Sequence, residues 1–269
     1  MSGRINRCFS AARGAGRKVL IPFITAGDPD PGETVALMHT LVEAGADLIE
    51  LGVPFSDPMA DGPVIQASSE RAIEKGVRLA DVLKWVAEFR EQDPDTPVVL
   101  MGYMNPFERF GTEPLAREAS RAGVDGLLMV DCPPEEMQDL HAALGDAGVA
   151  VIRLVAPTTS SARVSKIARG ASGFIYYVSF KGTTGASHLD TASLEAPLAQ
   201  LRSLTDLPLV VGFGIRDADS ARAAARHADG IVIGSALVAR LADSQGGAAA
   251  LETAAEFVGK VRDALDQSS

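Results

Sequence analysis

The sequence predicts an α/β protein in which residues 1–269 form one (β/α)8 barrel domain. Short apolar, β-prone runs alternate with segments of helical periodicity along the whole chain. Several helical segments end in Ala-Gly-Ala-Asp or Ala-Gly-Val-Asp, and such repeated endings indicate stacked βα units. Barrels of this kind typically need about 250 residues. An open dinucleotide-binding sheet would instead favour a G-x-G-x-x-G turn after the first strand, and the sequence has none there.

Eight runs are predicted to be the strands of this barrel. They are rich in Val, Ile, Leu and Phe, and turn-forming residues separate them from their neighbours. In chain order they cover residues 19–25, 46–51, 97–101, 124–130, 149–154, 174–179, 207–211 and 229–233. Because helical segments connect them, successive strands are expected to run parallel.

Helices are predicted between the strands and also ahead of the first one. Residues 33–43 place their apolar side chains on one face, and the long connection after the second strand holds two helical segments, 63–75 and 79–91. A helix before the first strand is expected to close the bottom of the barrel. Its apolar side carries Ile5, Cys8, Phe9 and Ala12.

The composition argues against several classes of function. A net charge of −10 and a pI near 4.9 argue against nucleic-acid or acidic-membrane surfaces, which need clustered Lys and Arg. No run approaches the ~18 apolar residues of a membrane helix, and we expect a cytoplasmic protein. The two cysteines lack C-x-x-C spacing and the four histidines form no H-E-x-x-H pair, so no metal site is expected.

Segment 47–63 carries carboxylates where a barrel binds its ligands. Glu50 lies among apolar residues in a predicted strand, where an unpaired carboxylate is costly unless it opens onto a cleft. Gly52 and Pro54 end that strand, which places Glu50 near its C-terminal end, the ligand-binding end of parallel barrels. Asp57 and Asp61 follow in the loop. A buried structural Glu paired with Arg or Lys is the alternative.

Glycine-rich loops after the last strands predict a phosphate site. Gly214 follows the seventh strand, and Gly234 and Ser235 follow the eighth and begin a short extra helix. Backbone N–H groups and a helix N-terminus can hold a phosphate without a lysine cluster, which suits an acidic protein with an anionic ligand. Gly185, in the loop after the sixth strand, could add a further N–H. The alternative is that these glycines only form turns.

Taken together, these motifs resemble the tryptophan synthase alpha chain family over nearly the whole chain. The resemblance rests on segments 22–29, 50–63 and 212–215, on Gly185, and on Gly234 and Ser235. It implies retro-aldol cleavage of a small phosphate ester, indole-3-glycerol phosphate, to indole and D-glyceraldehyde 3-phosphate. Indole would pass to a beta chain that carries pyridoxal phosphate, in an alpha2-beta2 heterotetramer, and this chain would hold no cofactor.

The resemblance also assigns roles to three site residues. Glu50 would be the acid/base that takes the proton from the substrate's side-chain hydroxyl and protonates indole C3. Asp61 would lie against the indole N–H and stabilise its positive charge. Burial should raise the pKa of Glu50, while Asp61 should stay ionised. Tyr176 matches the family's active-site tyrosine, and strand alternation predicts that Tyr177 faces the other way.

Further positions carried over by resemblance surround these three. The phosphate would contact Gly185, Gly214, Gly234 and Ser235. The indole pocket would be lined by Phe23, Met101, Leu128, Val130, Leu154 and Phe213, for which ordinary core packing is the alternative. Thr184 would be the lid residue that closes onto Asp61, in a lid that departs from the family's pattern at Phe180, Lys181 and Thr183. The face that meets the beta chain would carry Asp57, Pro58, Asn105, Pro106 and Asp131, the last three in neighbouring βα loops.

Three other functions compete with this hypothesis. A different phosphate-binding barrel enzyme, such as a sugar-phosphate isomerase, epimerase or aldolase, would often use a lysine or metal-binding histidines at strand ends, and the sequence shows neither. A stand-alone lyase would release indole without a beta chain. A catalytically idle subunit would only bind and activate the beta chain, but it need not keep Glu50, Asp61 and Tyr176 together.

Overall fold

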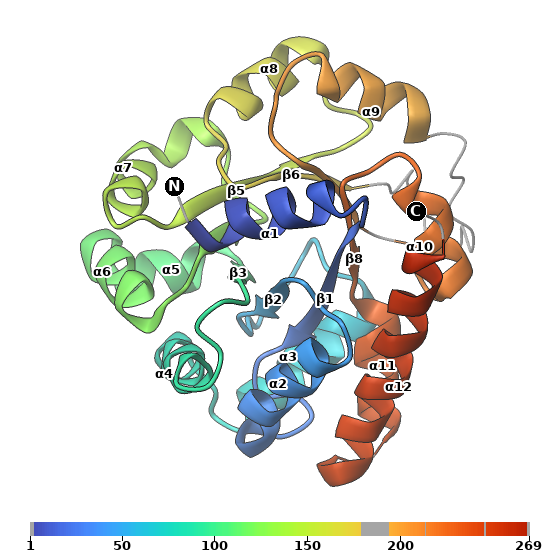
Figure 1. Ribbon diagram of the computed structural model, residues 1–269. Coiled ribbons are helices and arrows are strands. Elements are labelled where there is room, and N and C mark those ends of the chain that lie inside the picture. The colour runs from blue at the N-terminus through green and yellow to red at the C-terminus, as the bar shows by residue number, and fades with distance from the viewer. Residues whose placement is uncertain (1–2, 179–193, 213, 245, 268–269) are drawn as a thin grey trace.

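The computed structural model describes residues 3–178, 194–212, 214–244 and 246–267. Eight parallel strands form a closed barrel in which each strand pairs with the next along the chain and β8 pairs with β1 (Figure 1). The strands are β1 (Val19–Thr25), β2 (Ile49–Gly52), β3 (Val98–Gly102), β4 (Gly126–Met129), β5 (Ala150–Val155), β6 (Ile175–Val178), β7 (Leu209–Gly212) and β8 (Gly230–Ile233). The predicted (β/α)8 barrel is confirmed.

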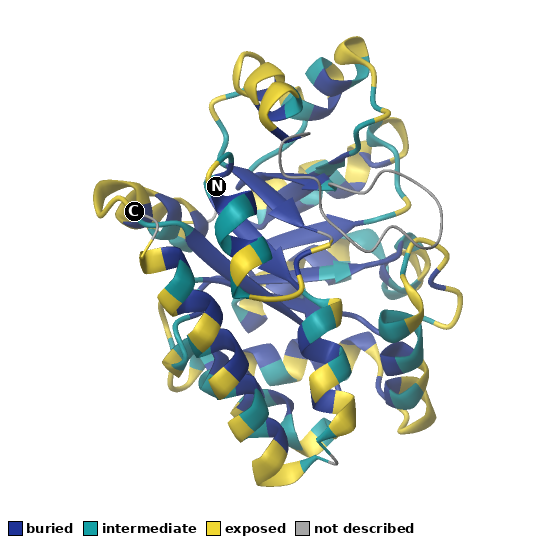
Figure 2. Cartoon of the chain, turned by 90° about the vertical axis from the view of Figure 1, so that its right-hand side faces the viewer, coloured by how far each residue is buried: buried dark blue, intermediate teal, exposed yellow. Residues whose placement is uncertain are grey.

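Helices surround the barrel, and their outward faces are exposed while the strands are buried (Figure 2). They are α1 (Gly3–Gly14), α2 (Thr34–Glu43), α3 (Pro63–Glu74), α4 (Leu79–Arg90), α5 (Met104–Phe110), α6 (Thr112–Ala122), α7 (Gln138–Asp146), α8 (Ser161–Arg169), α9 (Glu195–Arg202), α10 (Ala218–Ala225), α11 (Ser235–Asp243) and α12 (Gly247–Asp266), with 3-10 turns at Pro31–Glu33 and Pro134–Glu136. Within the described ranges, no helix combines the length and apolarity that crossing a bilayer requires.

Several details differ from the sequence-based expectation, including the bounds of the second to eighth strands, which shift by up to three residues. Asn105 and Pro106 do not lie in an irregular loop but in α5, where Pro106 occupies the first turn and needs no helical N–H partner there. The seventh strand begins at Leu209, not at residue 207, because Pro208 has no N–H to give to a ladder.

Strand alternation divides the apolar core into two layers. One layer lies between the strands and the helices and contains Tyr177, and the other fills the barrel interior and contains Tyr176, so the predicted opposite facing of these residues is confirmed. Helix α1 closes one end of the barrel, where Ile5 and Phe9 join the interior layer and the Phe9 ring lies 5.7 Å from that of Phe174 (Figure 1). The expected N-terminal helix is therefore present with its apolar side inward.

Four side chains at the lower rim, the end closed by α1, hold the starts of the strands in register. Each lies just before an even-numbered strand and accepts a backbone N–H from the start of the preceding odd-numbered strand. The pairs are Asp47 with Leu20 (2.9 Å), Asp125 with Val98 (3.0 Å), Ser172 with Val151 (2.8 Å) and Asp229 with Leu209 (2.8 Å). The Asp in the repeated Ala-Gly-x-Asp endings therefore fixes strand pairing, after the glycine has ended the helix.

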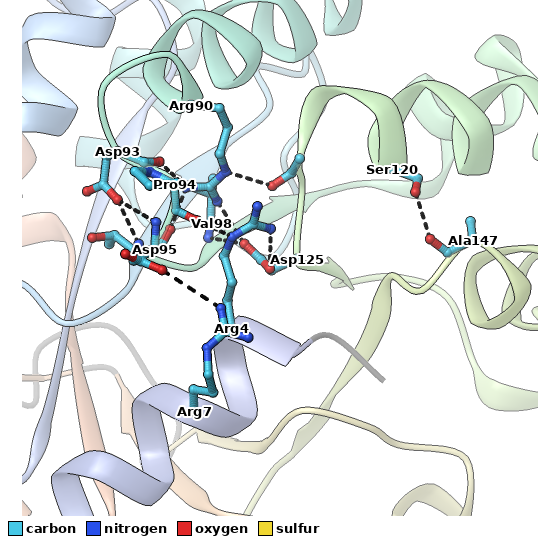
Figure 3. Close-up of polar contacts among 12 residues, drawn as sticks. Arg4, Arg7, Arg90, Asp93, Pro94, Asp95, Val98, Ser120, Asp125 and Ala147 are labelled. Atoms are coloured by element: carbon cyan, nitrogen blue, oxygen red, sulfur yellow. Dashed lines mark hydrogen bonds and ion pairs between the residues drawn. The ribbon is translucent and has the colours of Figure 1, made fainter.

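Asp125 also ties α1 to the barrel. Its carboxylate, almost fully buried, lies 2.8 Å from Nη2 of Arg90 on α4 and 3.2 Å from Nη1 of Arg4 on α1 (Figure 3). A second pair in the same view, Arg7 with Asp95, is exposed and spans 3.9 Å. Asp125 and Asp95 therefore allow a buried ion pair to be compared with an exposed one in the same region.

Replacing Asp125 by Ala should lower the free energy of unfolding by about 3 to 5 kcal/mol, because the charge of Arg90 would stay buried without its carboxylate partner and the Val98 N–H would lose its acceptor. Asp95→Ala is the control and should change stability by less than about 1 kcal/mol, because an exposed pair contributes little. Urea unfolding of the three proteins measures both values. Equal effects of the two substitutions would contradict this role of Asp125.

Candidate active site

A cavity opens at the C-terminal ends of the strands, the end of a barrel where ligands bind. Strand ends, the start of α3 and the loops after β7 and β8 all contribute to its wall. The described lining comprises Phe23, Glu50, Asp61, Gly62, Pro63, Val64, Ile65, Met101, Tyr176, Gly214, Ile215, Val232, Gly234 and Ser235. It brings together residues from strands β1, β2, β3, β6 and β8, far apart in the sequence.

Glu50 is held by the central register of β2, between Phe23 of β1 and Val99 of β3. Its side chain is 1% exposed, and neither carboxylate oxygen has a hydrogen-bond partner among the described residues. Burial, and after it the charge of Asp61, raises the pKa of Glu50 to about 8. The group therefore holds a proton at neutral pH, and the alternative of a structural Glu paired with Arg or Lys does not fit.

Asp61 lies where the loop after β2 turns into α3, and its N–H donates to the carbonyl of Pro58 (3.0 Å). Burial raises the pKa of Asp61 to about 6, and a hydrogen bond from the Tyr103 hydroxyl opposes that rise. The rise was not expected from the sequence. Asp61 is still largely ionised at pH 7, so the two carboxyl groups differ in charge as the sequence led us to expect.

Tyr103 is a site residue that the sequence reasoning missed. It follows β3 directly, its hydroxyl accepts the Ala60 N–H (3.0 Å), and its ring lies 5.2 Å from that of Phe55. The hydroxyl therefore contacts both the backbone of the loop and the carboxylate of Asp61. Its place just after a barrel strand was the signal that could have identified it.

Tyr176 points into the barrel next to a glycine that makes room for it. A Cβ on Gly212 of β7 would lie 2.0 Å from the Tyr176 hydroxyl oxygen, so only glycine permits this position. Burial, followed by the charges of Glu50 and Asp61, raises the pKa of Tyr176 well above its ordinary value. The hydroxyl therefore stays protonated and can act only as a neutral hydrogen-bonding group.

Three of the four residues expected to contact a phosphate lie in the wall of the cavity. Gly214, which has a positive φ of 77°, lines the cavity with Gly234 and Ser235, and α11 begins at Ser235. The first N–H groups of a helix have no partner within it and face outward. Gly185 and the lid residues Thr184, Phe180, Lys181 and Thr183 lie outside the described residues.

Only some of the positions expected to line an indole pocket lie at the cavity. Phe23 and Met101 line the cavity, and Val130 lines a small hollow beside it together with Asp61 and Tyr103. Leu128 is fully buried in the barrel interior and Leu154 packs against that layer, which favours core packing for both, while Phe213 lies outside the described residues. Apolar wall residues that sequence reasoning missed are Val64, Ile65, Ile215 and Val232.

The residues expected to face a partner differ in exposure. Asp57, Asn105 and Asp131 are exposed and Pro106 is half-buried, but Pro58 is buried within this chain. Asp131 accepts the Met104 N–H (2.8 Å) and so holds the start of α5. Met59 went unnoticed in the sequence, although it is 85% exposed in the loop that ends at Asp61. Among the described residues, no cluster of His, Cys, Asp and Glu could hold a metal ion.

The raised pKa of Glu50 predicts that Glu50→Gln stabilises the fold at alkaline pH. A carboxyl group with a raised pKa contributes stability that is present below its unfolded value of 4.5 and is lost as the pH rises to about 8. Urea unfolding at pH 5 and pH 8 should show the advantage of the variant growing by on the order of 4 kcal/mol. The exposed Glu43→Gln is the control and should follow wild type. A constant difference would mean that Glu50 is hydrated or paired.

Removing the Tyr103 hydroxyl should raise the pKa of Asp61 above about 6, because the ionised carboxylate loses a donor. A ¹³C NMR titration of Tyr103→Phe measures the shift directly. Tyr177→Phe removes a hydroxyl from the outer layer and is the matched control, which should leave Asp61 unchanged. An Asp61 titration that is the same in Tyr103→Phe and wild type would show that the hydroxyl does not act on it.

Comparison with known proteins gives one family throughout. A family model described as tryptophan synthase alpha chain matches residues 9–266. The tryptophan synthase alpha chain of Thioalkalivibrio sulfidiphilus is 57% identical over 264 residues, covering 98% of this chain and 99% of the relative. That of Xanthomonas euvesicatoria is 57% identical over 265 residues, with the same coverage.

Solved structures agree with the sequence relatives. The tryptophan synthase alpha subunit of Legionella pneumophila superposes with a TM-score of 0.90 at 40% identity and covers 98% of both chains. A chain from Mycobacterium tuberculosis tryptophan synthase has a TM-score of 0.89 at 32% identity, covering 98% of this chain and 99% of that one. With the family model matching nearly the full length, this chain belongs to the tryptophan synthase alpha chain family.

Proposed function

We propose that this chain cleaves indole-3-glycerol phosphate to indole and D-glyceraldehyde 3-phosphate, the lyase half-reaction of the family to which it belongs. One observation carries the assignment of roles. A buried, protonated Glu50 and a largely ionised Asp61 line the same cavity, so a proton donor and an anion are present together.

Cleavage of the carbon–carbon bond first requires a proton, which Glu50 supplies. Indole is a poor leaving group until its C3 is protonated, and a carboxylic acid with a pKa of about 8 holds that proton at neutral pH. Once ionised, Glu50 takes the proton of the side-chain hydroxyl while the carbon–carbon bond breaks and the aldehyde forms. The bonding electrons return to the indole ring, and Glu50 ends the cycle protonated.

Asp61 and Tyr176 act on the charge that this cycle creates. Protonation at C3 places positive charge on the ring nitrogen, and the ionised Asp61 stabilises it by accepting the indole N–H. Tyr176 adds a neutral hydroxyl to the same cavity without a competing charge. Phe23 and Met101 offer apolar surface for the ring.

The phosphate of the substrate fits the opposite wall of the cavity. Gly214, Gly234 and Ser235 place backbone N–H groups and the N-terminus of α11 at this wall, and the described lining of the cavity contains no Lys or Arg. Partial charges from the helix end stabilise an anion without a nearby cation that would favour ionisation of Glu50. In the proposal, Gly185 adds a further N–H to the phosphate, and Thr184 is the lid residue that closes onto Asp61.

A partner completes the proposed function. Membership of the family implies a beta chain, and we infer an alpha2-beta2 heterotetramer in which pyridoxal phosphate is bound by the beta chain. The exposed Asp57, Asn105 and Asp131 and the half-buried Pro106 lie around the loop after β2 and the start of α5, and they offer a polar contact surface for it. Pro58, being buried, would act there by shaping the loop.

Glu50→Gln should lower turnover of indole-3-glycerol phosphate by at least about 100-fold, since it removes the acid/base. It should leave binding of glycerol 3-phosphate, which carries the phosphate end of the substrate, nearly unchanged. Indole release by wild type and variant, assayed with and without a beta chain, and calorimetry with glycerol 3-phosphate give both values. Substantial turnover by Glu50→Gln would show that another group moves the proton.

The same assay separates the two remaining alternatives. We expect wild type to release indole slowly alone and much faster with a beta chain. Maximal release without the partner would favour a stand-alone lyase. No release under either condition would favour an idle subunit.

A further inference from the structure

The backbone around Asp61 is held by a side chain from the next helix. Gln66 lies one turn into α3, and its Nε2 is 2.8 Å from the carbonyl oxygen of Asp61 and 3.5 Å from that of Pro58. Both partners are acceptors, so only the NH2 end of the amide can face them. The Gln66 N–H also donates to the carbonyl of Gly62 (3.0 Å), which fixes the side chain relative to the same turn.

Helix α3 is a firm base for this tether because two contacts bind it to the end of β1. The hydroxyls of Thr25 and Ser68 lie 2.7 Å apart and are buried. Further along the helix, Arg71 pairs with the buried Asp28 through two hydrogen bonds of 2.7 and 2.8 Å. A bidentate pair with a buried carboxylate is among the stronger polar contacts in proteins.

Strand β1 therefore locates both carboxyl groups of the site. Glu50 is set beside Phe23 of β1 by the strand register. Asp61 is set through α3, which β1 anchors, and through the Gln66 amide that reaches back to the Asp61 carbonyl. The tether acts on the main chain and leaves the Asp61 carboxylate free for the cavity.

We propose that Gln66 is a positioning residue for Asp61, whose carbonyl it holds so that the carboxylate stays at the cavity wall shared with Glu50. This inference rests on the proposed function for its kinetic consequence, but the positioning itself is a property of the free chain. Gln66 is not itself among the described residues that line the cavity, and in the proposal it does not contact the substrate.

The groups that face Asp61 make the positioning measurable. Among the described residues these are Glu50 from β2, Tyr103 from the end of β3 and Tyr176 from β6. Gln66 itself is neutral, so removing its amide changes no charge near Asp61. A change in the Asp61 titration on replacing Gln66 by another neutral residue therefore reports movement of the carboxylate.

The test compares Gln66→Met, which keeps the length but removes the donor, with Gln66→His, whose neutral imidazole keeps an N–H donor. Gln66→Met should lower kcat by about 10- to 100-fold with a small change in KM, as a misplaced catalytic group does. Gln66→His should recover most of kcat. In ¹³C NMR the pKa of Asp61 in Gln66→Met should fall from about 6 toward the ordinary value of about 3.9, because the freed loop reaches water.

Gln200 offers a matched control. Its Nε2 also donates a hydrogen bond, in this case to Ser161 Oγ at 2.7 Å, but it lies on α9, outside the barrel. Gln200→Met should leave kcat and the Asp61 titration as in wild type. If Gln66→Met does not fold, Gln66→Leu takes its place in the kinetic comparison, since it is also neutral and has no donor.

Wild-type kcat and an unshifted Asp61 titration in Gln66→Met would overturn the inference. So would equal losses of kcat in Gln66→Met and Gln66→His with no shift of Asp61, which would indicate a purely structural role. If wild type does not cleave indole-3-glycerol phosphate, the proposed function fails, and the titration of Asp61 alone then decides whether Gln66 positions it.

Discussion

The strand register at the lower rim is the constraint on which the rest of this structure depends. A parallel barrel closes only when every strand starts at the right height, and four side chains at the lower rim set that height by accepting N–H groups from neighbouring strands. Asp47 does this three residues before Glu50, so the interaction that aligns β1 with β2 also sets where Glu50 emerges. The lower rim, which stabilises the fold, and the cavity, which holds the candidate active site, lie at opposite ends of the same strands.

The two ends of the barrel also differ in their electrostatics. Each of the three aspartates at the lower rim has a cationic partner, which is Arg90 for Asp125, Arg262 for Asp47 and Arg202 for Asp229. The upper cavity has no such partner in its described lining, and there Glu50 is protonated. A carboxyl group therefore forms an ion pair at the lower rim and acts as a proton donor in the cavity, according to whether an arginine lies close enough to pair with it.

Local sequence patterns predicted two kinds of feature: the repeated βα units of the barrel, and a residue whose type does not fit its surroundings. The alternating periods and the Ala-Gly-x-Asp endings gave the barrel, and a carboxylate in an apolar run identified Glu50. Gln66 could not be found in this way, because its significance lies in the direction of its side chain, which reaches back to the Asp61 carbonyl. For Tyr103 the sequence offered only its place after a strand, while its contacts with the loop after β2 depend on how that loop folds. The burial of Pro58 likewise depends on how the loop after β2 packs, and the start of α5, which contains Asn105, depends on Asp131 accepting the Met104 N–H.

The pairing of the rim contacts gives the chain a modular structure. Each contact joins an odd strand to the even strand that follows it, so β1 with β2, β3 with β4, β5 with β6 and β7 with β8 are each bound by a polar bond internal to the pair. The barrel can therefore be described as four pairs of βα units that share one core. A circular permutation or a chain break placed after an even strand would leave all four bonds within intact segments, whereas a break inside a pair would turn one of them into a bond between fragments.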